Sequence, residues 1–146
     1  VKQAVGIAGV TTKRLVRAFD IQPDLEGIAA VLAVHPLLLP RSYVSTTVER
    51  RDGELRVAFL PCPASEEDDG LTWPALLTHA DGHRMIEVVA GCTAPQARVV
   101  VAPPAEGELA AWTISIDPDG EPYAEPSEVL LTEFSTGALF EFQRRG

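Results

Sequence analysis

The chain has 146 residues, of which 46% are hydrophobic and 23% charged, a globular composition rather than a disordered one. Its formal net charge of −9 argues against nonspecific binding to nucleic acid or to anionic membranes. No apolar run approaches the roughly 20 residues of a membrane-spanning helix, and the N-terminus lacks the apolar core of a signal peptide. We therefore expect a single domain, residues 1–146, in the cytoplasm, with both cysteines reduced. The abundance of Ala, Val, Arg and Pro is typical of a high-GC bacterial coding sequence.

The first 36 residues are predicted to be helical, and their charge differs from that of the remainder. The first 19 positions hold four basic and no acidic residues, whereas the rest of the chain holds 8 basic and 21 acidic residues. A helix ending near Gly9 and a second one starting at Thr11 or Thr12 would have the outline of a helix-turn-helix. The alternative is a pair of helices that packs on a sheet. A DNA-binding regulator would use the basic side chains of this part: Lys13, Arg14 and Arg17.

A further helix is predicted over residues 22–35. Asp24 suits its N-cap, and apolar residues from Leu25 to Leu32 recur at helical spacing. The helix should end at His35, because the residue before Pro36 is disfavoured in helical backbone. The apolar residues that follow lie between prolines and are expected to fill one end of the core or to line a pocket: Leu37, Leu38 and Leu39.

Residues 42–146 are predicted to be mostly β-structure. Residues 42–61 form a hairpin around Asp52-Gly53, with alternating apolar residues on its return strand. Residues 98–102 and 109–117 are predicted strands, and residues 128–134 and 138–143 a final hairpin. One or two short helices are expected near residues 72–92, although residues 82–92 also fit a strand. The predicted fold class is α+β, with N-terminal helices packed on an antiparallel sheet of about five to six strands.

Two groups of residues are candidates for chemistry. His79, Asp81 and His83 could ligate a transition metal with Glu87 or Cys92, or they could flank an ordinary Asp-Gly turn. Cys62 could be a thiol nucleophile with a distant histidine as its base, or a small buried hydrophobic residue. Either group would make the protein an enzyme with a metal or thiol site.

The leading hypothesis is a non-catalytic binding or regulatory module. The sequence has no phosphate-binding loop, nucleophile elbow or CxxC motif, so neither catalysis nor a cofactor is expected. The predicted partner is a small apolar ligand or a protein, not nucleic acid or a membrane. An apolar pocket would be lined by the three leucines named above and by aromatic residues: Trp73, Trp112, Phe134 and Phe140.

Overall fold

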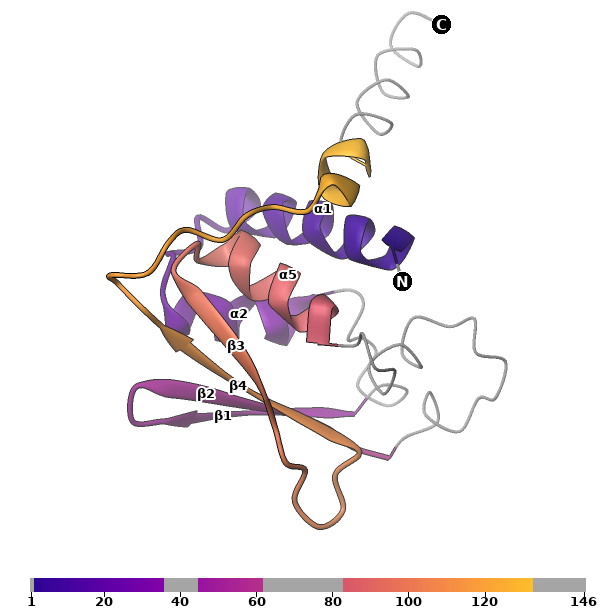
Figure 1. Ribbon diagram of the computed structural model, residues 1–146, viewed down its shortest axis with the longest axis vertical. Helices are drawn as coiled ribbons and strands as arrows, with labels where there is room; N and C mark the ends of the chain where they lie inside the picture. Colours follow the sequence, from indigo (N-terminus) through magenta and orange to yellow (C-terminus); the bar gives the residue numbers. More distant parts are fainter. Residues whose placement is uncertain (1, 36–44, 62–82, 133–146) are drawn as a thin grey trace, which may run out of the picture.

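The computed structural model describes residues 2–35, 45–61 and 83–132, which form an α+β architecture (Figure 1). The described helices are α1 (Lys2–Ala18), α2 (Leu25–Val34) and α5 (His83–Thr93), and residues 127–132 are also helical. The described strands are β1 (Thr46–Arg51), β2 (Glu54–Phe59), β3 (Ala97–Ala102) and β4 (Ala110–Ile116). These strands form one antiparallel sheet in the order β1-β2-β4-β3.

The described helices cover one face of this sheet in two layers. α5 packs on β3 and β4, α2 packs on β2 and β4, and α1 packs against α5 on the side away from the sheet (Figure 1). Alternate residues of a strand point to opposite faces, so each central strand gives one row of side chains to the core. The core side chains of these strands are fully or almost fully buried: Leu55, Val57 and Phe59 from β2, and Trp112 and Ile114 from β4.

The hairpin predicted over residues 42–61 and the helix predicted over residues 22–35 are both confirmed in their described parts. Gly53 lies in the turn with a φ of +72°, which glycine adopts without strain, and β1 pairs with β2 in register on either side. Asp24 caps α2, because its Oδ1 accepts a hydrogen bond of 2.8 Å from the Gly27 N–H. His35 follows α2 as its C-cap in extended backbone, as expected before a proline.

The helix-turn-helix prediction is wrong, because α1 is one continuous helix through Gly9. Gly9 is buried, and a Cβ atom there would lie 2.5 Å from a methyl carbon of Val129 and 3.2 Å from one of Val88. The glycine therefore allows residues 127–132 and α5 to approach α1 closely, rather than ending a helix. This role depends on tertiary contacts and leaves no mark in the local sequence.

The prediction of five to six strands is also wrong, since the described residues form four. Residues 127–132 are helical, whereas a strand was predicted from residue 128. The Val129 N–H donates to the Pro126 carbonyl at 3.0 Å, and the Val129 side chain is fully buried against α1. The apolar run in this segment is too short to show a helical or a strand period, so its conformation depends on its packing against α1. Residues 83–93 adopt the helical alternative, and the strand expected at 138–143 lies outside the described residues.

Candidate functional site at the edge of the sheet

The three basic residues that are candidates for DNA contact all lie on α1. Lys13 Nζ lies 3.0 Å from Glu125 Oε1, so the segment after β4 neutralises this charge. Arg14 and Arg17 are exposed on α1, and Asp20 is the second residue after the end of the helix. DNA binding through these residues therefore stays a prediction, without the helix-turn-helix outline that suggested it.

The candidate metal and thiol residues lie mostly outside the described part of the chain. His83 is the first residue of α5 and is half-buried, but His79, Asp81 and Cys62 are not described. Cys92 lies on α5, partly buried against the core. Among the described residues, no group of three or more His, Cys, Asp or Glu side chains could hold a metal ion. The metal and thiol sites therefore remain predictions.

The predicted apolar pocket is described at one position only. Trp112 is 3% exposed on β4 and belongs to the core beneath the helices. In the sheet it lies between Val57 of β2 and Val101 of β3. The other candidates lie outside the described residues: Leu37, Leu38, Leu39, Trp73, Phe134 and Phe140.

A buried polar pair joins the two N-terminal helices. The Thr12 hydroxyl donates to the Ala8 carbonyl at 2.7 Å, so its oxygen is available to accept from the His35 Nε2–H at 3.2 Å. His35 is 1% exposed, and burial lowers the pKa of its imidazole below the ordinary 6.5. The pair satisfies two buried polar groups and holds the end of α2 against α1, which is a structural role.

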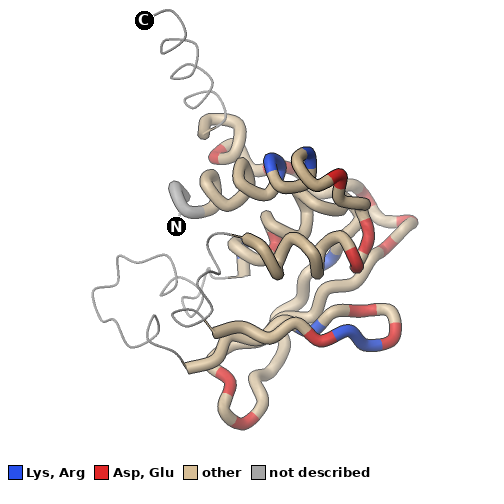
Figure 2. The backbone as a smooth tube through the Cα atoms, turned by 180° about the vertical axis from the view of Figure 1, so that it is seen from behind, with Lys and Arg blue, Asp and Glu red and all other residues tan. Residues whose placement is uncertain are grey.

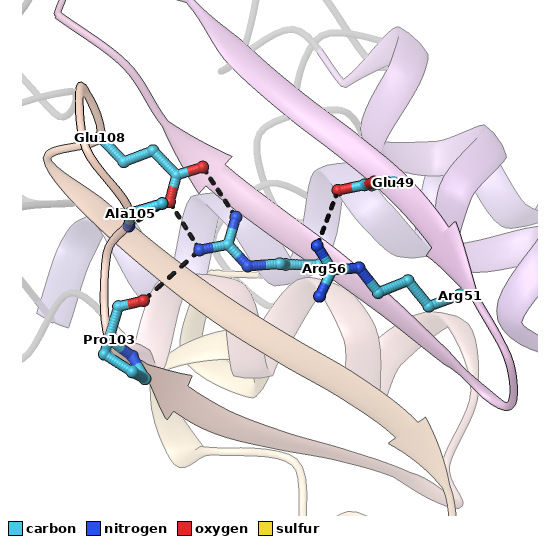
Figure 3. A network of polar contacts seen from close by, with 6 residues as sticks. All are labelled: Glu49, Arg51, Arg56, Pro103, Ala105 and Glu108. Carbon is cyan, nitrogen blue, oxygen red and sulfur yellow. Dashed lines mark hydrogen bonds and ion pairs between the residues drawn. The ribbon is translucent and has the colours of Figure 1, made fainter.

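A second polar network fixes the loop that follows β3. Arg56 lies on the sheet face away from the helices and binds Glu108 through two hydrogen bonds, of 2.7 and 2.6 Å (Figure 3). These bonds, together with one from the Ala105 N–H, lower the pKa of Glu108 to about 2. Arg56 also donates to the Pro103 carbonyl at 3.4 Å. The network therefore positions the residues directly after β3.

Strand β3 forms one edge of the described sheet and exposes apolar side chains. Val100 is 62% exposed and Val101 is 64% exposed, and they point to opposite faces because they are neighbours in a strand. An exposed edge strand with few charged side chains is a template for pairing with another strand. The sequence signal for this edge is a run of three valines after Arg98, followed by Ala102 and a pair of prolines.

The hydrogen-bond pattern shows which backbone groups of β3 face outward. The Asp117 N–H donates to the Gln96 carbonyl at 2.9 Å, in register with the β3–β4 ladder. Paired residues in an antiparallel ladder alternate between hydrogen-bonded and non-hydrogen-bonded positions. Because Gln96 is a hydrogen-bonded position, Arg98, Val100 and Ala102 also hydrogen-bond to β4. The β1–β2 ladder at the other side of the sheet alternates in the same way, because the Leu60 N–H donates to the Ser45 carbonyl in register with that ladder. Val99 and Val101 therefore direct their N–H and C=O groups away from β4.

The other edge strand, β1, is protected by charge. It carries Glu49, Arg50 and Arg51, and these make ion pairs with one another or with α2. Figure 2 shows this concentration of charge at the β1–β2 hairpin. Charged side chains on an edge strand discourage pairing with a further strand. Of the two edges, β3 is thus the one suited to receive a partner.

Comparison with known proteins gives no further guide to this site. No protein-family model, no curated protein and no solved structure matches the chain. In the described part of the chain, none of the helices combines the length and apolar character needed to cross a bilayer.

Proposed function

We propose that this chain is a non-catalytic protein-binding module that receives an extended strand of a partner along β3. The observation that carries the proposal is the outward direction of the Val99 and Val101 backbone groups beside two exposed valine side chains. Strand addition to a sheet edge derives its affinity from main-chain hydrogen bonds and its specificity from alternate side chains.

Features around β3 support this choice. α5 packs on β3 and β4 from one face, and the ladder to β4 covers all six residues of the strand. The edge is therefore held in a defined extended conformation before a partner arrives, which reduces the ordering cost of binding. The binding of a small apolar ligand has less support, because Trp112 is a filled core position.

The test uses a synthetic peptide with the sequence of residues 96–103 and heteronuclear NMR titration of the full chain. We expect shift changes and slowed amide exchange centred on Val99 and Val101. Val101→Pro removes an outward N–H without removing a bond to β4, and should weaken peptide binding about fivefold or more, the value of one hydrogen bond.

Val48→Pro is the matched control, since Val48 has the corresponding outward position on β1 and is also a partly exposed valine. It should leave peptide binding unchanged. Saturable binding that maps to another face, or equal weakening by both substitutions, would contradict the proposal. Circular dichroism and thermal unfolding of each variant check that the fold is kept.

A further inference from the structure

We propose that the strand received by β3 is β3 of a second copy of this chain, so that two sheets join across a two-fold axis into one antiparallel sheet. This inference rests on the proposed function, because it requires the β3 edge to be open to strand addition. Three observations support it. The outward backbone groups of β3 are arranged symmetrically, the residues that flank them already have hydrogen-bond partners within the chain, and the charges of the strand fit the pairing.

The outward groups of β3 are arranged symmetrically about Val100. In an antiparallel pairing centred on this residue, Val99 of one copy lies opposite Val101 of the other, and the reverse pair forms on the far side of the axis. Both members of each pair direct N–H and C=O outward, so each pair exchanges both of its hydrogen bonds. Every outward backbone group of Val99 and Val101 is then satisfied by an identical strand.

The residues that flank this symmetric segment are already satisfied within one chain. At one end, the Ala97 N–H donates to the Ala94 carbonyl at 2.9 Å, and the Ala97 carbonyl accepts from Arg98 Nη1 at 3.0 Å. At the other end, Pro103 has no N–H, and its carbonyl accepts from Arg56. The register centred on Val100 places Ala97 opposite Pro103 of the second copy. It therefore creates no unsatisfied donor at either end of the ladder.

The side chains and charges of the edge fit the same register. On the outer face Val100 meets Val100 of the second copy, and on the helical face Val101 meets Val99, so the exposed valines become covered. Arg98 is the one charged residue of β3, and it lies opposite Ala102 of the second copy rather than opposite a like charge. Each copy carries a net charge of −9, so pairing should strengthen as salt screens the repulsion.

The test is sedimentation velocity of the full chain from low micromolar to submillimolar concentration. We expect a reversible dimer that is favoured at higher ionic strength. Val101→Pro should weaken association about 25-fold, because a two-fold interface loses the same hydrogen bond twice, at about fivefold each. Val48→Pro should leave the association constant unchanged.

A cysteine at the axis gives a second readout. Val100 of each copy forms a non-bonded pair with about 4.5 Å between Cα atoms, which suits a disulfide. In a background with Cys62→Ser and Cys92→Ser, Val100→Cys should cross-link rapidly under mild oxidation, whereas Val48→Cys should not.

The outcomes separate this inference from the proposed function. A chain that stays monomeric throughout, while its β3 still binds the peptide of residues 96–103, would overturn the second copy as partner and leave strand addition standing. A chain that stays monomeric and does not bind the peptide either would overturn both the pairing of two copies and strand addition along β3. A dimer that survives Val101→Pro and cross-links no faster through position 100 than through position 48 would show a different interface and overturn the inference.

Discussion

Acidification should weaken the fold through one buried histidine. His35 is 1% exposed and donates to the Thr12 hydroxyl, whose own proton is bound to the Ala8 carbonyl. A protonated imidazole would be a charge in the core between α1 and α2. Lowering the pH from 7.5 to 5.0 should therefore reduce the free energy of unfolding.

The size of the loss follows from the two states of the imidazole. Burial lowers the folded-state pKa of His35 below 6.5, so its stabilising effect is complete above pH 6.5 and declines as the pH falls toward the folded-state value. Each pH unit below 6.5 costs about 1.4 kcal/mol while the folded imidazole stays neutral. The loss at pH 5.0 is therefore at most about 2 kcal/mol.

Urea denaturation of the wild type and of His35→Gln at both pH values measures this effect. The variant should be less stable at pH 7.5, because a packed ring and its hydrogen bond are lost, but its stability should change less with pH. The difference between the two pH slopes isolates His35 from the other histidines. Equal slopes for both proteins would refute the assignment of the pH dependence to His35.

Three further predictions concern the core and the sheet. Trp112→Ala should lower the free energy of unfolding by about 3–5 kcal/mol, measured by urea denaturation, and a loss below about 1 kcal/mol would contradict its place in the core. Gly91→Ala should destabilise α5 because its Cβ meets the Tyr123 ring, and should become neutral or stabilising in a Tyr123→Ala background; equal effects in both backgrounds would disprove this contact. Glu108 has its pKa lowered to about 2, so its contribution to stability is present above pH 4.5 and lost as the pH falls toward 2. Glu108→Gln should remove the loss of stability between pH 4.5 and 2 that is due to Glu108, measured by circular dichroism during acid titration. An unchanged acid titration curve would count against the Arg56–Glu108 pair.

The elements with strong local signals were predictable from the sequence. Asp24 as an N-cap and the Asp52-Gly53 turn each follow from side-chain and backbone preferences within a few residues. The alternating apolar residues of β2 likewise predicted the buried face of the sheet. In these segments the local preference and the final fold agree.

The errors fall where distant segments decide the structure. Glycine is a typical helix-ending residue, but Gly9 lies inside α1. It allows Val129, more than a hundred residues later in the chain, to pack closely against the helix. Residues 127–132 are helical, and Val129 is fully buried beside Gly9. The local hydrophobic periodicity does not predict this packing.

The candidate site was hidden from the sequence for a related reason. The valines of β3 predicted a strand, but its place at the edge depends on the strand order β1-β2-β4-β3. The outward direction of Val99 and Val101 depends on the hydrogen-bond phase set by Gln96 and Asp117. Neither property is local.

Amide hydrogen exchange along β3, measured by NMR in dilute solution and then at high concentration, tests the account most directly. We predict slow exchange at Val100, which bonds to β4, and fast exchange at Val99 and Val101 in the dilute chain. At high concentration, or with the peptide of residues 96–103 added, Val99 and Val101 should become protected as well. Protection of Val99 and Val101 already in the dilute chain would mean that the edge is not open, and would contradict the proposed function and the pairing of two copies together.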